Sequence, residues 1–288
     1  MSEPVCIVTG ATSGIGRATA LGLARRGASV GIVARDAGKA RAIADEIVRG
    51  GGAMPMIFLA DLGSQAAVRR VAREILDRCP RLDVLVNNAG VVNLRRETTV
   101  DGHESVFAVN HLAYWSLTLL LLDRLRESAP SRVVNVSSDA HKIVDGISFE
   151  DPGFDRGWST MKVYGHSKLA NILFTRELAR RLEGSGVTVN CLHPGAVATG
   201  LGKNNGRIAR GLIALLKPFF RTPESGAETS IHLAASPEVA GRSGGYWARC
   251  RERSPSAAAL DAGAARRLWD LSASLTGIGL DEDGRVVA

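Results

Sequence analysis

Cysteine is scarce in this 288-residue sequence, and the four that occur, Cys6, Cys79, Cys191 and Cys250, lie far apart. They form no CxxC pair and show no spacing typical of metal ligands. Scattered cysteines favour reduced thiols over a disulfide framework or a zinc site. We therefore expect a cytoplasmic protein that holds no metal.

Long hydrophobic runs are also missing. The most apolar stretch, residues 112–122, contains Tyr114, Trp115 and Ser116 and is too short to cross a bilayer. The apolar run at residues 5–9 is too short for a signal peptide and leads directly into glycines. We expect no targeting segment and no transmembrane anchor, and residues 112–122 to form a buried helix.

The net charge of +7 is positive, but dense basic clusters are absent. The lysines and arginines are spread through every predicted helix and are not interleaved with aromatic residues. This distribution argues against a nucleic-acid partner. A mildly positive surface field attracting an anionic cofactor is the simpler interpretation.

The chain shows no internal repeat, no low-complexity linker and no obvious domain boundary. Short apolar runs instead alternate with segments of helical periodicity. The runs predict strands over residues 5–9, 29–34, 56–60, 83–86, 132–136, 187–192 and 244–247. Helices are predicted over residues 17–26, 39–49, 64–78, 104–127, 163–182, 223–235 and 264–275. This alternation is typical of one α/β domain, here residues 1–288, with helices on both faces of a parallel sheet of about seven strands.

A glycine-rich loop follows the first predicted strand and opens the first helix. Gly10 permits a tight turn, Gly14 lets the backbone approach a pyrophosphate, and Gly16 allows close helix packing. Phosphates bind the free N–H groups at such a helix start. The loop therefore predicts a Rossmann-type, doubly wound sheet that binds a dinucleotide, with a ligand-free glycine turn as the alternative.

Tyr164 and Lys168 are four residues apart in a predicted helix, so they share one face about one turn apart. A nearby ammonium favours the phenolate, so we expect the pKa of Tyr164 to lie below its usual value of about 10. A tyrosine tuned in this way exchanges a proton with an alcohol oxygen near neutral pH. A chance pair on a solvated helix is the alternative.

The motif Thr9-Gly10, three variable residues and Gly14-Ile15-Gly16 resembles the loop of the short-chain dehydrogenase/reductase family. Further motifs of that family follow in order: Asn87-Asn88-Ala89-Gly90, Asn110, Ser137-Ser138, Tyr164 with Lys168, and His193-Pro194-Gly195. The closest resemblance is to the retinol dehydrogenase group, through residues 132–141, the long gap before Tyr164, residues 168–178 and Arg267-Leu268-Trp269. It spans essentially the whole chain and implies hydride transfer between a nicotinamide cofactor and an alcohol or carbonyl.

The resemblance implies four catalytic residues. Tyr164 donates a proton in reduction and accepts one in oxidation, while Lys168 lowers the pKa of Tyr164 and binds the nicotinamide ribose. Ser138, rather than Ser137, donates a hydrogen bond to the substrate oxygen as charge grows there. Asn110 holds a water that links Lys168 to solvent, with a helix-capping or core amide as the alternative.

The end of the second strand bears on the choice between NAD and NADP. An acidic residue there would bind the ribose 2′-hydroxyl of NAD, but the chain has Ala34 followed by Arg35. A guanidinium clamps a phosphate through paired hydrogen bonds, so we expect NADP(H) rather than NAD(H). Asp36 is an acidic residue nearby that would favour NAD(H), unless it pairs with Arg35. The remaining predicted cofactor contacts are Thr12, Ser13, Gly14, Ile15, Gly16, Asp61, Leu62, Asn88, Ala89, Gly90, Pro194, Gly195, Val197 and Thr199.

The predicted substrate is a small lipophilic alcohol, aldehyde or ketone. Apolar residues within 200–222, among them Leu212 and Phe220, would form a flap over the site, with a helix docked on the protein's own core as the alternative. Pairing through the two long helices would give a homodimer or homotetramer, unless residues 139–162 cover that face. A non-catalytic dinucleotide-binding regulator and a sugar-nucleotide epimerase stay open as other functions.

Overall fold

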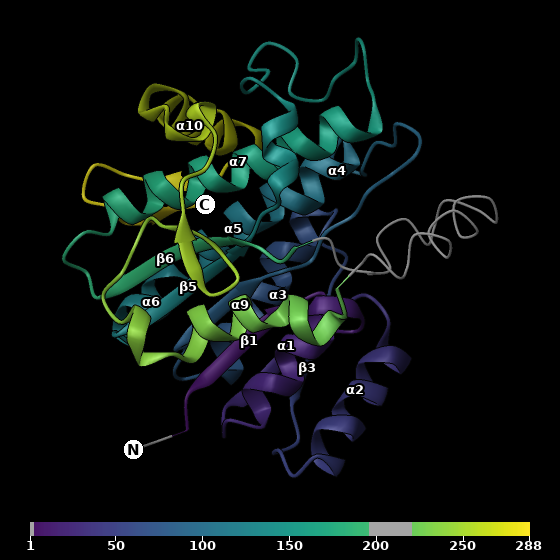
Figure 1. Ribbon diagram of the computed structural model, residues 1–288, viewed down its shortest axis with the longest axis vertical. Coiled ribbons are helices and arrows are strands. Elements are labelled where there is room, and N and C mark those ends of the chain that lie inside the picture. Colours follow the sequence, from purple (N-terminus) through teal and green to yellow (C-terminus); the bar gives the residue numbers. More distant parts are fainter. Residues whose placement is uncertain (1–2, 196–220) are drawn as a thin grey trace.

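A mostly parallel β-sheet runs through the centre of the protein, whose computed structural model describes residues 3–195 and 221–288 (Figure 1). The strands are β1 (Val5–Thr9), β2 (Ser29–Ala34), β3 (Met56–Leu59), β4 (Val84–Asn87), β5 (Ser131–Val136), β6 (Val187–His193), β7 (Tyr246–Ala248) and β8 (Arg251–Arg253). They lie in the order β3-β2-β1-β4-β5-β6-β7-β8, and β8 is antiparallel to β7. The predicted doubly wound fold is confirmed.

Helices cover both faces of the sheet (Figure 1). One face carries α1 (Gly14–Ala24), α2 (Ala37–Arg49) and α9 (Pro223–Ala235); the other carries α3 (Gln65–Arg78), α5 (Ala113–Leu120) and α7 (Thr160–Arg181). Helix α10 (Ala262–Thr276) packs on the outside of α7. Successive side chains of β1 point to opposite faces of the sheet, so Ile7 packs into one hydrophobic core while Cys6 and Val8 pack into the other.

Local sequence explains where the helices begin. Ser64 accepts a hydrogen bond from the N–H of Ala67 at 3.3 Å, so it caps α3. Ser159 caps α7 in the same way, which starts that helix at Thr160, before the predicted position 163. Helix α1 starts at Gly14 and ends at Ala24, not at residues 17 and 26. Arg25 follows the last helical residue, and Gly27 then ends the helix with a left-handed φ of 81°. Its N–H donates to the carbonyl oxygen of Ala24 at 2.9 Å, and the next N–H, that of Ala28, donates to Leu23 at 3.2 Å.

The long helix predicted over residues 104–127 is interrupted. It consists of α4 (Ser105–Phe107), a π-helical turn (Ala108–Leu112), α5 and α6 (Leu122–Glu127). Strand β8 and the small hairpin of β9 (Gly279–Leu280) and β10 (Val286–Val287) were not predicted. Short strands rich in charge or glycine give too weak a periodicity to be recognised. Most of the predicted 200–222 flap lies outside the described residues.

The topology fixes where a ligand fits. Strand β1 lies between β2 and β4, so the connections on its two sides run in opposite directions. Sheets of this kind bind ligands beyond the carboxyl ends of the strands at this reversal. The loops after β1, β2, β4, β5 and β6 meet there.

Candidate active site

A cavity of about 480 Å³ lies at this edge of the sheet. Its walls include most of the residues predicted from the sequence: Gly10, Thr12, Ser13, Gly14, Ile15, Gly16, Arg35, Asp61, Leu62, Asn88, Ala89, Gly90, Tyr164, Lys168 and Pro194. Val197 and Thr199 lie outside the described residues. A larger groove of about 900 Å³ lies at the amino ends of β5 and β6 and contains none of the predicted site residues.

Two glycines let the cavity floor come close to its neighbours. Gly10 has a φ of 66°, and a Cβ there would lie 2.8 Å from the Cα of Ala89. A Cβ on Gly16 would lie 2.4 Å from the carbonyl oxygen of Gly10 and also collide with the Asn88 amide. Neither position tolerates a side chain, because strand β1, helix α1 and the loop after β4 touch here. A dinucleotide fits this backbone cradle.

The loop after β4 is tied to β1 by hydrogen bonds. Thr9 Oγ1 accepts from the backbone N–H groups of Asn88 at 2.9 Å and Ala89 at 3.0 Å. The Asn88 amide donates to the carbonyl oxygen of Thr9 at 2.8 Å. These bonds fix the middle of the cavity wall.

One end of the cavity carries positive charge. Arg35 and Lys39 both line it, and both are exposed. Asp36 accepts a hydrogen bond from the N–H of Lys39 at 2.9 Å and forms an ion pair with its ammonium at 3.5 Å. Asp36 therefore caps α2 and pairs with Lys39 rather than with Arg35. Lys39 was missed from the sequence, although it lies one helical turn after Arg35.

The other end carries Tyr164 and Lys168. The Lys168 ammonium donates to the carbonyl oxygen of Val136 at 3.0 Å and lies 5.6 Å from the Tyr164 ring centroid. Burial lowers the pKa of Lys168 to about 7. Burial also raises the pKa of Tyr164 to about 12, against a smaller lowering by a hydrogen bond with Ser138. The predicted depression of the Tyr164 pKa by Lys168 is thus wrong, because burial disfavours the phenolate more than the Ser138 hydrogen bond favours it.

The two neighbouring serines point to different partners. Ser138 interacts with Tyr164, and its Oγ accepts from the N–H of Ala140 at 3.1 Å. Ser137 donates to the carbonyl oxygen of Lys168 at 2.7 Å and is almost fully buried. The structure therefore places Ser138, and not Ser137, beside the phenol.

Asn110 lies behind Lys168 in the π-helical turn. Its Oδ1 accepts from the N–H of Val91 at 2.8 Å, and its Nδ2 donates to the Val91 carbonyl at 3.1 Å and to Ser167 at 3.1 Å. A Cβ on Gly90 would lie 3.3 Å from Asn110 and 3.8 Å from the Lys168 ammonium. The Asn110 side chain thus serves as a core amide, which was the alternative to the proton relay. Its part in a proton relay stays a prediction.

Pro194 lines the cavity, and Gly195 follows it at the end of the first described part of the chain. The Arg221 guanidinium donates to the carbonyl oxygen of Pro194 at 3.4 Å and pairs with Glu228 at 3.2 Å. A Cβ on Gly195 would lie 2.8 Å from the Arg221 side chain. Arg221 therefore fixes the backbone next to the cavity.

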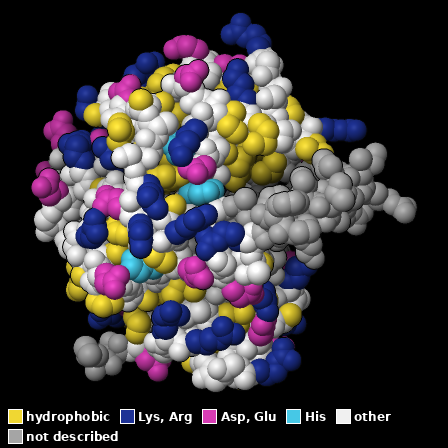
Figure 2. Space-filling model, in the orientation of Figure 1, with side chains coloured by type: hydrophobic (Ala, Val, Ile, Leu, Met, Phe, Trp, Pro, Cys, Tyr) yellow, Lys and Arg dark blue, Asp and Glu magenta, His cyan; other side chains and the backbone are white. Residues whose placement is uncertain are grey.

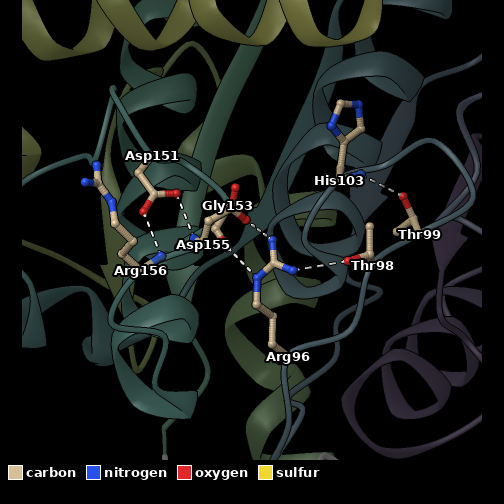
Figure 3. A network of polar contacts seen from close by, with 8 residues as sticks. All are labelled: Arg96, Thr98, Thr99, His103, Asp151, Gly153, Asp155 and Arg156. Atoms are coloured by element: carbon tan, nitrogen blue, oxygen red, sulfur yellow. Dashed lines mark hydrogen bonds and ion pairs between the residues drawn. The ribbon is translucent and has the colours of Figure 1, made fainter.

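A polar network of side chains and backbone groups holds the loop that contains Asp151, Gly153 and Asp155 (Figure 3). Arg96 forms an ion pair with Asp155 and donates to the carbonyl oxygen of Gly153 at 3.3 Å. Asp151 accepts from the N–H of Asp155 at 2.8 Å and so rigidifies the same loop. This loop buries Phe154, which packs with Val106, Val163, Val91, Trp158 and the ring of Tyr164. We call residues 151–158, which share an apolar cluster with Tyr164, the loop wall.

On the face drawn in Figure 2, several lysine and arginine side chains lie next to one another across the middle, with acidic side chains above and below them. No helix among the described residues is both long and apolar enough to span a membrane. All four cysteines are free thiols, as predicted.

Comparisons with known proteins decide the family. A family model described as short chain dehydrogenase matches residues 4–208. The chain belongs to the short-chain dehydrogenase/reductase family. It is an oxidoreductase close to the retinol dehydrogenases, and its fold implies a nicotinamide dinucleotide cofactor.

Relatives of this dehydrogenase span nearly its full length. Retinol dehydrogenase 14 of Mus musculus is 48% identical over 96% of the chain and 87% of that protein. Retinol dehydrogenase 13 of Homo sapiens is 44% identical over 94% of the chain and 84% of that protein. A Mycobacterium paratuberculosis protein of uncharacterised function has a similar structure, with a TM-score of 0.78, 35% identity and coverage of 96% and 94%. Pseudomonas aeruginosa RhlG, solved with NADP, has a TM-score of 0.68, 32% identity and coverage of 85% and 94%.

Proposed function

We propose that this dehydrogenase transfers a hydride between NADP(H) and a lipophilic alcohol/carbonyl pair. One observation carries the proposal: a single cavity has Tyr164, Lys168 and the adjacent Ser138 at one end and Arg35 with Lys39 at the other. A dinucleotide laid along it would bring its nicotinamide to the phenol and its adenosine ribose to the two cations. The bound cofactor supplies the hydride for reduction and accepts it in oxidation.

The residues beside the phenol manage the proton. In reduction, the Tyr164 hydroxyl passes its proton to the carbonyl oxygen as the hydride reaches the carbonyl carbon, and the product is the alcohol. Ser138 donates a hydrogen bond to the same oxygen while negative charge grows on it. Lys168 binds the nicotinamide ribose, and when charged it stabilises the phenolate left behind. Because burial keeps Tyr164 protonated in the ligand-free protein, the resting site is prepared for reduction.

Arg35 and Lys39 support NADP(H) over NAD(H). Two cations at the adenosine end suit a 2′-phosphate, and the guanidinium can clamp it through two hydrogen bonds. Asp36 is occupied by its helix cap and its pair with Lys39, so it does not neutralise Arg35. The NADP complex of the similar RhlG supports the same assignment.

Three observations support a lipophilic substrate. The relatives at 42–48% identity carry the name retinol dehydrogenase. The cavity is also lined by Val91 and Val92, and Val91 packs in the same apolar cluster as Tyr164. The loop wall adds Trp158 and Phe154 to the cluster around the phenol. We further propose one catalytic domain over residues 1–288, in the cytoplasm.

A cofactor-resolved screen tests the proposal. Purified protein is mixed with a panel of aliphatic, aromatic and retinoid aldehydes, with NADPH and with NADH separately, and absorbance is followed at 340 nm. We expect turnover of lipophilic aldehydes with higher kcat/KM for NADPH. Tight NADPH binding without turnover of any carbonyl would instead identify a non-catalytic dinucleotide-binding regulator.

A further inference from the structure

The peptide group that joins Ser138 to Asp139 is held at both of its polar atoms. Its carbonyl oxygen lies 2.7 Å from Nδ1 of His141. Its N–H donates to Nδ1 of His193 at 3.1 Å. His141 is buried, and His193 comes from the end of the neighbouring strand β6. The peptide that follows Ser138, the serine beside Tyr164, is therefore hydrogen-bonded to two imidazole rings.

The hydrogen bonds determine the proton position on each ring. A carbonyl oxygen can only accept, so Nδ1 of His141 carries a hydrogen. Its bare Nε2 then accepts from the N–H of Ser256 at 3.0 Å. A backbone N–H can only donate, so Nδ1 of His193 is bare, and its Nε2–H faces the Asp139 carboxylate at 3.6 Å. The two histidines are neutral and of opposite tautomer.

A second proton on either ring would break the arrangement. On His193 it would place an N–H against the N–H of Asp139, and on His141 an N–H against the N–H of Ser256. Burial is the main reason that the pKa values of both histidines lie below their usual value. A second proton on His193 would free the N–H of Asp139, so that side of the peptide would no longer fix the backbone that carries the Ser138 hydroxyl. A second proton on His141 would leave its bond to the Ser138 carbonyl intact and remove the contact with Ser256.

The charged groups around His141 and His193 have opposite effects on the protonation of the two rings. Asp139 favours protonation of both rings, while Lys142 disfavours it for both. His141 and Arg221 also disfavour a charge on His193. The Asp139 carboxylate is itself occupied, because it accepts from the Tyr246 hydroxyl at 2.9 Å and pairs with Lys142 at 2.8 Å. The ring of Tyr246 packs edge-on against His141.

We propose that His141 and His193 are positioning residues. As neutral rings of opposite tautomer they hold the peptide between Ser138 and Asp139, and this orients the Ser138 hydroxyl toward the substrate oxygen. Protonation of His193 releases the N–H of that peptide and lowers kcat without changing cofactor binding, whereas protonation of His141 removes the contact with Ser256 that holds its ring in place. This inference rests on the proposed function, in which Ser138 acts on the substrate oxygen.

The first experiment needs no activity. Long-range ¹H–¹⁵N spectra of histidine-labelled protein report the tautomer of each ring, with assignments from His141→Asn and His193→Asn variants. At pH 7.5 we expect the Nδ1–H form for His141 and the Nε2–H form for His193, and both should titrate below pH 6.5. Equal tautomers, or a doubly protonated ring at pH 7.5, would overturn the proposal.

The second experiment measures the pH profile of reduction. Asparagine at position 193 presents Oδ1 to the Asp139 N–H and does not titrate. We expect His193→Asn to retain the rate at pH 7.5 within about threefold and to move the acid limb to lower pH. His193→Ala should lose at least about tenfold in kcat with an unchanged KM for NADPH. His232→Gln, remote from the cavity, is the matched control and should keep the wild-type profile.

The outcomes separate the two proposals. Wild-type protein that reduces no carbonyl refutes the proposed function. The tautomers still show whether His141 and His193 hold the peptide after Ser138. An active enzyme in which His193→Asn and His193→Ala behave alike, or in which both keep the wild-type acid limb, refutes the positioning role. If His193→Ala fails to fold, the comparison of His193→Asn with wild type and the tautomer spectra still decide.

Discussion

Burial governs the proton on Tyr164 and Lys168 in the ligand-free protein. The four-residue spacing correctly predicted that both side chains share one face of α7, because helical geometry follows from the sequence alone. The sign of the Tyr164 pKa shift could not be predicted, because it depends on how much water the surrounding sheet and loops exclude. Under the proposed function, bound cofactor and substrate would have to lower the pKa of Tyr164 for oxidation.

Removing the phenolic hydroxyl should abolish most of the activity. Tyr164→Phe keeps the ring that packs with Val106 and Val163 but loses the proton donor. We expect kcat to fall about 10²–10⁴-fold, with NADPH affinity nearly unchanged. Steady-state rates and fluorescence titration with NADPH measure both. Tyr114→Phe serves as the control and should stay near wild type; comparable rate losses in the two variants would contradict the assigned role.

Lys168 should make stability depend on pH. Its folded-state pKa of about 7 lies below the ordinary value of 10.5, so the unfolded chain binds more protons between these values. Stability should therefore rise with pH across this window by at most about 1.4 kcal/mol per pH unit. Lys168→Met should exceed the cofactor-free wild type in stability near pH 7 and lose that advantage toward pH 10.

Urea unfolding of the cofactor-free protein at several pH values between 7 and 8.5 tests this expectation. Lys162→Met changes an exposed lysine on the same helix and provides the control. A stability difference between Lys168→Met and wild type that stays constant with pH would show that Lys168 remains charged in the fold.

Arg35 should discriminate between the two cofactors. Arg35→Ala removes the guanidinium at the adenosine end of the cavity, and we expect the KM for NADPH to rise at least about tenfold, as for the loss of a charged hydrogen bond. The KM for NADH should change little. Arg41→Ala, exposed on α2, is the control. Equal effects on the two cofactors would refute the phosphate clamp.

Whole elements were predicted where the periodicity is strong and missed where side chains bend the backbone. The sheet strands β1 to β7 and the amphipathic helices came from apolar patterning. The π-helical turn did not, because it accompanies the two hydrogen bonds between the Asn110 amide and the Val91 backbone, a contact between distant loops. No helix or strand was predicted for the loop wall, since its conformation depends on partners such as Arg96.

The contacts that hold the loop wall should matter more for the KM of the substrate than for the free energy of unfolding. The Arg96 side chain is 34% exposed and that of Asp155 is 75% exposed, so their ion pair contributes at most about 1 kcal/mol. Arg96→Ala should therefore leave the unfolding free energy within about 1 kcal/mol of wild type. It should nevertheless raise the KM for lipophilic aldehydes severalfold, because the segment that packs Phe154 against the Tyr164 cluster loosens.

The neighbouring exposed Arg95 provides the matched control, since Arg95→Ala touches none of the contacts in Figure 3. Rates measured with a short and a long aldehyde separate the effects. An Arg96→Ala enzyme with unaltered KM for both would show that the loop wall does not contact substrate.

At the scale of the molecule, the C-terminal segment closes the helical face that the two long helices would otherwise expose. Trp269 of α10 packs edge-on against Trp115 of α5 at 4.5 Å between ring centroids, and both rings contact Phe174 of α7. The indole of Trp115 donates to the carbonyl oxygen of Ile278 at 3.0 Å. The sequence predicted the helix at 264–275 but not its partner, because an apolar stripe does not say which surface it will cover.

This packing bears on assembly. The side chains of Trp115 and Phe174 are almost completely buried, and Trp269 of α10 packs against both, so we expect α10 to hinder pairing through this part of the α5 and α7 face. A homodimer or homotetramer would have to use another surface. The face should become available only when α10 is displaced.

Trp269→Ala tests that covering role. The substitution removes a large ring from the junction of three helices and also the surface on which the Arg181 guanidinium stacks at 4.0 Å. We expect the unfolding free energy to fall by about 3–5 kcal/mol in urea titrations. Light scattering after size exclusion should show concentration-dependent association, because the uncovered face is apolar. Leu260→Ala, at an exposed leucine just before α10, is the control, and a Trp269→Ala protein that matches it in both measurements would show that α10 is not what closes this face.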